Sequence, residues 1–454
     1  MTSNIEKKEE VPEHIKLLSI TDRYLVDLEC LREMFAAVMP VLQDQDKQRK
    51  AAVDEVISRA ERISENGEAT EGKPESDDET ADEEEKSQRI KLRIQDIETM
   101  VSNVRKIKRA ETLFTKQLIV SVVSRFDEFL GTFLEIALEQ NPEWLKSSEK
   151  TITYKELIDL KSVDTAIKGV ISKEVEQLLR GSHEEQIRYV DEKLKLGIQE
   201  HFSKLKCFLE VAERRNLFVH TGGLVSSQYI DKCKGFGASV KNIEEGQELE
   251  VTESYFEEAF YAYFEIGLRI GQAAFRRLFP SEIDVSDNAL NKLAIKFLNY
   301  DDNSLVEIIT NYDLNIPSKF RSEDSENEYY ARINRAIAQK RLGIDFEKGL
   351  EGPPWKAFHP KYRLCLHVLR DEYLEAAEMM KSSEVIDSIG IEGFRTWPVF
   401  REFRSSQEFQ EAYKQSFDQA YVPDPERDAS TIKRQEEVLS ENSGETDTNT
   451  ELVH

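Results

Sequence analysis

The sequence has few cysteines and no long apolar segment. Four of its 454 residues are cysteine, and none belongs to a Cys-x-x-Cys pair, which argues against both a disulfide framework and a zinc site. No apolar run reaches the roughly 18 residues that a membrane span needs. Residues 1–10 contain no apolar stretch of the kind found in secretory signals. We therefore expect a cytoplasmic protein that has no membrane partner.

The short motifs of the common enzyme classes are also missing. The sequence has no phosphate-binding Gly-x-x-x-x-Gly-Lys-Ser/Thr loop, no dinucleotide-binding Gly-x-Gly-x-x-Gly after a strand and no Gly-x-Ser-x-Gly elbow. It has no His-Glu-x-x-His helix and no calcium loop. With 88 aspartates and glutamates, no pair of carboxylates stands out as a glycosidase or metal site. We accordingly predict no cofactor and no metal.

The net charge of −26 is concentrated in two segments. Residues 65–85 hold eleven acids and one lysine, a charge of −10, and residues 424–454 hold nine acids and three bases, a charge of −6. The first of these segments has no aromatic residue and cannot bury a core, so we predict a flexible linker or long loop. Residues 89–116 instead carry eight bases and three acids. This stretch is either a contact for nucleic-acid phosphates or a solvated helix face.

Apolar residues recur at helical spacing through most of the remaining chain, which predicts an all-α protein. Residues 13–63 form one or two helices, and a long helix from residue 90 ends at Asn141-Pro142. Residues 221–250 form an irregular segment with room for a short hairpin. The other helices expected before residue 280 are 153–180, 184–197, a helix that ends at Gly222-Gly223, and one that begins at a capping box of Ser254 and Glu257 and runs to Leu278.

The region after Pro280 is predicted to consist of helical hairpins. The residues from Tyr362 to Met380 resemble a hairpin of the tetratricopeptide type, in which Ala376 and Ala377 let neighbouring helices approach. No strict 34-residue period is visible, so the region is repeat-like only. The helices expected here are Ala289–Asn299, Ser304–Tyr312, Glu326–Leu342, Lys361–Arg370 and Tyr373–Lys381.

These patterns divide the chain into five regions. Residues 1–64 are an N-terminal helical segment and residues 65–88 an acidic disordered linker. Residues 89–281 form a helical domain, residues 282–422 a domain of helical hairpins, and residues 423–454 a disordered acidic tail.

One short segment carries candidate chemistry, Glu210 to Gly223, with the sequence Glu-Val-Ala-Glu-Arg-Arg-Asn-Leu-Phe-Val-His-Thr-Gly-Gly. On a helical wheel Arg215 lies at one edge of an apolar stripe, and His220 lies at the other edge on the same side as Asn216. Polar groups that flank an apolar stripe are typical of a site at a packed helix interface.

This segment resembles the HEPN superfamily, all-helical domains whose signature is an arginine, commonly followed by Asn, Asp or His, and a histidine four to six residues further on. Arg215, Asn216 and His220 match that signature. The following Thr-Gly-Gly-Leu-Val-Ser-Ser-Gln-Tyr, and the residues from Gly246 to Tyr255, are similar to HEPN branches found in prokaryotic conflict systems. The resemblance covers about residues 89–281.

The resemblance implies a metal-independent endoribonuclease, as in toxin or phage-defence effectors, that works as a homodimer on RNA. It implies that His220 acts as acid or base, that Arg215 clamps the phosphate, and that Asn216 holds the histidine or the phosphate. Glu213 is a candidate to fix the tautomer of the imidazole. The alternative is a non-catalytic adaptor that dimerises through its HEPN-like domain and binds a protein through the C-terminal helical unit. In that case Arg215 pairs with an acid of the fold.

Overall fold

The computed structural model describes residues 11–67, 79–147, 162–322, 326–350 and 359–424. These residues form helices joined by short turns, with one isolated β-bridge between Leu224 and Glu248 and no strand. The predicted all-α class is confirmed. The chain divides into two compact units, residues 1–274 and 275–454. The division falls inside a helix, whereas the sequence suggested a boundary at residue 281.

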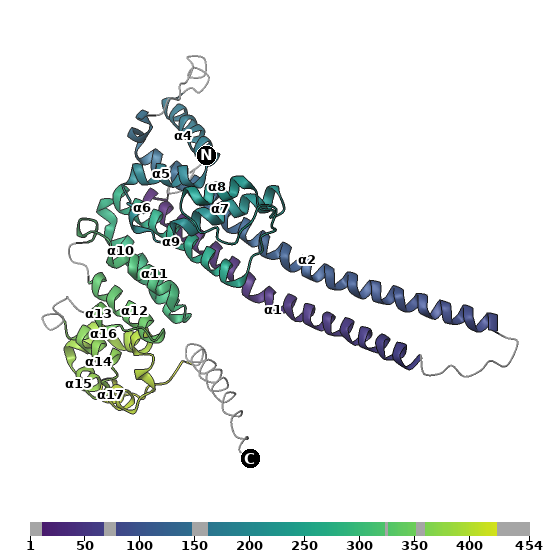
Figure 1. The fold of residues 1–454 in the computed structure, drawn as a ribbon. Coiled ribbons are helices and arrows are strands. Elements are labelled where there is room, and N and C mark those ends of the chain that lie inside the picture. The colour runs from purple at the N-terminus through teal and green to yellow at the C-terminus, as the bar shows by residue number, and fades with distance from the viewer. Residues whose placement is uncertain (1–10, 68–78, 148–161, 323–325, 351–358, 425–454) are drawn as a thin grey trace, which may run out of the picture. The chain divides into compact units, whose positions relative to one another are not determined.

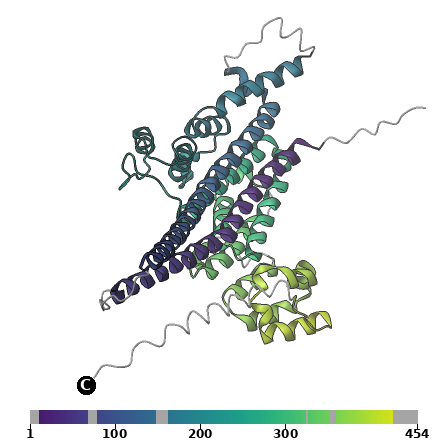
Figure 2. The same ribbon diagram turned by 90° about the vertical axis from the view of Figure 1, so that its right-hand side faces the viewer.

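Two long helices dominate the first unit. Helix α1 spans Glu13–Gly67 and α2 spans Glu79–Gln140, and at 1.5 Å per residue they are about 82 and 93 Å long. They run side by side as a hairpin whose far part extends beyond the other helices of this unit (Figures 1 and 2). Helix α1 continues through Pro40, so residues 13–63 form one helix. Helix α2 ends where Asn141-Pro142 predicted.

The acidic segment predicted as a linker differs from that expectation at both of its ends. Residues 65–67 complete α1, and residues 79–88 form the first turns of α2. Residues 68–78 and the predicted tail beyond residue 424 lie outside the described residues.

Helix α9, Glu253–Leu278, packs closely against α1. A Cβ added to Gly267 would lie 2.1 Å from the Tyr24 ring, and one added to Gly271 would lie 2.4 Å from the Thr21 hydroxyl. The Tyr24 hydroxyl donates to the Tyr263 carbonyl at 2.8 Å. Two glycines one turn apart therefore allow α1 and α9 to approach closely.

The predicted capping box of Ser254 and Glu257 at the start of α9 is wrong. Thr252 caps this helix, because its hydroxyl accepts from the Tyr255 amide at 3.2 Å. Helix α9 begins at Glu253, so Ser254 already lies inside the helix. Its hydroxyl is 3.2 Å from that of Thr252.

Shorter helices complete the first unit around an aromatic core. Rings from α1, α2, α7 and α9 meet there, since Phe126 contacts Phe208 with centroids 4.9 Å apart and Tyr263 at 5.6 Å, and Tyr24 stacks on Phe129 at 4.7 Å. The shorter helices are α4 (Val163–Leu179), α5 (His183–Leu194), α6 (Ile198–His201), α7 (Leu205–His220) and α8 (Ser227–Gly235).

The second unit consists of helices that pack on their sequence neighbours. Its helices are α10 (Ile283–Asn299), α11 (Asn303–Leu314), α12 (Asn327–Arg341), α13 (Glu347–Leu350), α14 (Pro360–Leu369), α15 (Tyr373–Met380), α16 (Ser383–Thr396) and α17 (Gln407–Phe417). Five of them correspond to the five helices predicted from the sequence, four with both ends within two residues, whereas α10 begins six residues before the predicted start. Ala376 and Ala377 are buried on α15 as expected.

Two hairpins of this unit use the same turn. Asp301 between α10 and α11 has φ 57°, and Asp371 between α14 and α15 has φ 60°. The amides of Asp302 and Glu372 each donate to the carbonyl five residues earlier, both at 2.9 Å. Aspartate tolerates this left-handed conformation better than most residues. The two hairpins therefore share one local turn geometry.

Among the described residues, no helix combines the length and the apolar character that crossing a membrane would require.

Candidate functional site

The motif helix α7 is anchored by an apolar face in the first unit. The side chains of Phe208, Val211 and Ala212 are buried, and α7 packs on α2, α5 and α8. The helix ends at His220, because the Thr221 and Gly223 amides both donate to the Leu217 carbonyl. Gly222 and Gly223 have φ values of 66° and 101°, conformations that favour glycine. The predicted helix stop at this glycine pair is confirmed.

Lys116 on α2 fixes the turn that follows the motif helix. Its ammonium donates to the Gly222 carbonyl at 2.8 Å and to the Glu248 carboxylate at 2.6 Å. A Cβ on Gly223 would lie only 2.8 Å from the same ammonium. The hydrogen bond from Lys116 lowers the pKa of Glu248 from its ordinary value. Glycine at position 223 is therefore favoured by its backbone conformation, and any larger residue would also displace the Lys116 ammonium.

Arg215 contacts two polar partners within the first unit. Its Nη2 lies 3.2 Å from Asp127 Oδ2 on α2, and its Nη1 donates to Asn216 Oδ1 at 3.2 Å. The Arg215 side chain is 25% exposed. A guanidinium has five N–H donors, so these two contacts leave donors for a ligand.

Asp127 joins Arg215 to a histidine that the sequence motif does not contain. Asp127 Oδ1 lies 3.0 Å from His183 Nε2, at the start of α5. Burial, and then the charge of Asp127, raise the pKa of Tyr24 well above its usual value. Asp127 therefore faces an imidazole, a guanidinium and the edge of the aromatic core.

His220 lies apart from this cluster. It is exposed at the C-terminal end of α7, and no described residue forms a hydrogen bond or ion pair with its imidazole. Five residues along a helix correspond to about 7.5 Å of axial rise and a rotation of about 140°. The helix therefore does not bring Arg215 and His220 to one point, and Asn216 bonds to Arg215 instead of His220.

Glu213 occupies a different environment from the one predicted. Both of its carboxylate oxygens accept from Lys232 on α8, at 2.9 and 3.0 Å. It lies seven residues before His220, two turns or about 10.5 Å along the helix axis. The structure therefore pairs Glu213 with a lysine, and the proposed contact with the imidazole is not present.

Glu210 forms a second polar cluster on the same helix. Its buried carboxylate accepts from Arg214 Nε at 2.8 Å and from the hydroxyls of Tyr229 and Tyr255. The Arg214 guanidinium lies over the Tyr255 ring at 3.8 Å. Burial, and next the Glu210 charge, raise the pKa of Tyr255 well above its usual value. These hydrogen bonds link α7 to α8 and α9, so we interpret the cluster as structural.

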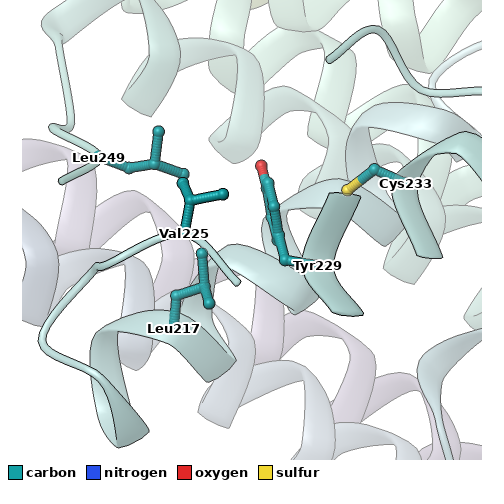
Figure 3. Close-up of a cluster of buried hydrophobic side chains, with 5 residues drawn as sticks. All are labelled: Leu217, Val225, Tyr229, Cys233 and Leu249. Carbon is teal, nitrogen blue, oxygen red and sulfur yellow. The ribbon is translucent and has the colours of Figure 1, made fainter. Parts of the chain in front are cut away.

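An apolar cluster lies beneath this loop. Figure 3 shows the side chains of Leu217, Val225 and Leu249 together, with Tyr229 beside them and Cys233 further along α8. Backbone bonds between Val225 and the Gly246-Gln247 pair, both 2.9 Å long, close the segment. The expected short hairpin is thus reduced to one isolated bridge.

The described residues contain no group of three or more His, Cys, Asp or Glu side chains arranged to hold a metal ion. The described cysteines are all free. Burial raises the pKa of Cys207 and of Cys233 to about 12, so both remain protonated thiols near neutral pH and are poor nucleophiles.

Sequence reasoning missed Asp127 and His183, although each carries a signal. Asp127 is an acid within the apolar run that includes Phe126 and Phe129. Ser182 and Glu185 form a capping box that opens α5, which places His183 at a defined first helical position. Neither signal indicates that these residues meet Arg215. Compared with protein-family models, curated proteins and solved structures, the chain matches none of them.

Proposed function

We propose that this protein is a metal-independent endoribonuclease of the HEPN type, of the kind that acts as a toxin or phage-defence effector. The proposal rests on the exposure and the unused hydrogen-bonding groups of the two motif side chains, Arg215 and His220. Arg215 retains unused donors at a partly exposed position, and His220 presents an exposed imidazole without a partner among the described residues. Both lie in the last two turns of one helix.

The proposed reaction needs few groups. The 2′-hydroxyl of a ribose attacks the adjacent phosphorus, His220 assists proton transfer, and Arg215 stabilises the charge that grows on the phosphorane oxygens. The 5′-oxygen leaves with a proton, so the products are a 2′,3′-cyclic phosphate and a 5′-hydroxyl. Asn216 orients the guanidinium through its side-chain oxygen.

The proposal includes a homodimer. Because Arg215 and His220 are separated by about 140° around their helix, a single copy does not direct both at one phosphate. Two copies that pair their α7 helices would let Arg215 of one copy and His220 of the other act on the same phosphate.

The test is incubation of the purified full chain with total RNA in EDTA, followed by analysis of the cleaved ends. We expect cyclic phosphate and 5′-hydroxyl ends from the parent protein and none from His220→Ala. Arg215→Lys should also fail, because an ammonium cannot reproduce the planar two-pronged contact of guanidinium with phosphate oxygens. His367→Ala and Arg188→Lys, changes in the second unit and on the surface of α5, serve as controls and should cleave normally.

A second candidate is a non-catalytic helical adaptor, and one observation favours it. Asp127 forms an ion pair with Arg215 within the first unit, and such a pair can serve the fold alone. The adaptor would dimerise through the first unit and bind a protein through the hairpins of the second. An inactive parent protein, together with a lowered melting temperature for Arg215→Ala, would decide for this function.

A further inference from the structure

One carboxylate, Asp127, is shared between the candidate phosphate clamp and a histidine from another helix. Its two oxygens lie 3.2 Å from Arg215 Nη2 and 3.0 Å from His183 Nε2. The three side chains come from α2, α5 and α7, and Asp127 and Arg215 are 88 residues apart in the chain. This arrangement therefore depends on the packed fold and not on the motif helix alone.

The histidine is held rigidly. Its ring lies 6.0 Å from that of Phe126 and 5.8 Å from that of Phe208, and its side chain is 11% exposed. The capping box of Ser182 and Glu185 fixes the first turn of α5, where His183 lies. Side chains packed in this way keep one rotamer, so His183 is a fixed support for the carboxylate.

Three buried polar atoms of the cluster remain without a well-aligned hydrogen bond among the described residues. They are Asp127 Oδ1, His183 Nε2 and Arg215 Nε. Buried groups in such a state need an explanation because they lose their hydration without full compensation. The hydrogen bond from Arg215 Nη2 to Asp127 Oδ2 is 3.2 Å long, longer than the roughly 2.7–2.9 Å usual for a charge-assisted pair, so the carboxylate orients the guanidinium and leaves it able to bind an anion.

We propose that Asp127 and His183 are positioning residues for Arg215, an inference that rests on the proposed ribonuclease function. Asp127 holds one edge of the guanidinium so that the free N–H groups of Nη1 and Nη2 face the phosphate, and His183 holds Asp127. A guanidinium oriented in advance reduces the cost of ordering it in the transition state. The carboxylate also opposes substrate binding, because it competes with phosphate for the same cation. Orientation is therefore gained at the expense of ground-state affinity.

The test separates these two effects with two RNA probes. Cleavage is measured as kcat on RNA, and binding is measured as the affinity for a 2′-O-methyl oligoribonucleotide, which has no attacking hydroxyl. For Asp127→Ala in the full chain we expect kcat to fall by roughly tenfold or more while the oligoribonucleotide binds at least as tightly as before. Asp127→Asn, which retains an acceptor for Arg215, should recover part of kcat. Glu128→Gln, a change of the exposed neighbouring acid, should alter neither quantity.

Histidine variants give an independent measurement. His183→Gln keeps an N–H donor near the position of Nε2 and should retain more kcat than His183→Ala, with similar melting temperatures for both. If His183→Gln and His183→Ala lose kcat equally, and in proportion to their fall in melting temperature, the role of His183 is purely structural and the inference is overturned.

The proposed function can fail separately. If the parent protein cleaves no RNA, that function is excluded, and the inference is judged by binding alone. Tighter oligoribonucleotide binding by Asp127→Ala, abolished when Arg215→Ala is added, would still show that Asp127 controls Arg215. If Asp127→Ala and the double variant with Arg215→Ala both bind the oligoribonucleotide with the affinity of the parent protein, the positioning role of Asp127 is refuted.

Discussion

The ammonium of Lys116 on α2 lies 2.6 Å from the carboxylate of Glu248, at the end of the loop that follows the motif helix. Lys116 is 9% exposed and Glu248 is half exposed, so the lysine reaches from the interior of the unit to the loop surface. The same ammonium also binds the Gly222 carbonyl. One buried cation thus connects the long helical hairpin to both ends of the segment between residues 222 and 248.

We predict that Lys116→Met destabilises the first unit by about 1–3 kcal/mol, because the Gly222 carbonyl loses a charged donor while methionine keeps the apolar stem. Lys108→Met on the same helix is the control. Lys108 is 54% exposed, and its ammonium pairs with the Glu111 carboxylate at 3.1 Å, so its loss should cost no more than about 0.5 kcal/mol. Thermal unfolding followed by circular dichroism measures both. Equal shifts would show that the buried position of Lys116 adds nothing.

The sequence predicted those elements of the fold that local chemistry determines. Asn141-Pro142 ends α2, because proline cannot continue a helix, and the glycine pair after His220 ends α7, because glycine readily adopts the positive φ found there. Five of the eight α-helices described in the second unit were also predicted, because their apolar spacing is a local pattern. The cap of α9 was misplaced by two residues, because Thr252 and Ser254 are equally suitable caps by residue type.

The polar cluster around Arg215 could not be predicted in this way. Asp127 lies 88 residues from Arg215, and no local pattern indicates which of many acids a fold brings to a given arginine. For Glu213, a local pattern suggested the wrong partner. Its position on the motif helix suggested His220 as its partner, but Lys232 of the neighbouring α8 binds both of its oxygens. Tertiary contacts decided both cases.

Alanine substitutions at two helical glycines should have opposite effects on stability, because one glycine lies where α1 and α9 approach closely and the other lies in open space. A Cβ at Gly267 would overlap the Tyr24 ring, which is itself stacked on Phe129, so Gly267→Ala should destabilise by about 1–3 kcal/mol. Gly169 lies inside α4 with no atom within 4 Å of an added Cβ. There, alanine should stabilise by about 0.5–1 kcal/mol, because it restricts the unfolded chain and favours the helix. Urea unfolding curves give both signs, and a neutral Gly267→Ala would contradict the close packing.

The second unit should lose stability as the pH rises through a window set by Asp313. Burial raises the pKa of this carboxyl to about 6, although Arg321 and Arg276 oppose the shift. The folded state then binds the proton more tightly than the unfolded state, so the stabilisation is complete below about pH 4 and is lost as the pH rises through about 6.

We expect Asp313→Asn to remove this dependence. The difference in unfolding free energy between the parent and Asp313→Asn should change between pH 5 and pH 7, in the direction that makes the parent relatively less stable at pH 7. Replacing Trp144 by Phe in both proteins confines tryptophan fluorescence to residues 275–454, so urea titrations then report on this unit. Asp387→Asn, a change of an exposed acid on α16, should give a difference that is the same at both pH values.

A composite site makes a prediction about mixed dimers. If Arg215 of one copy works with His220 of the other, Arg215→Ala and His220→Ala chains are each inactive, but a mixed dimer contains one intact site. Random exchange of equal amounts makes half of the dimers mixed, and each of these has one of two sites intact, so about a quarter of the parent activity should return. The chains are mixed, exchanged under mild denaturant, and assayed on RNA in EDTA. Continued inactivity, with exchange verified by tagged chains, would show that each site draws both residues from one copy and would exclude the proposed pairing of α7 helices.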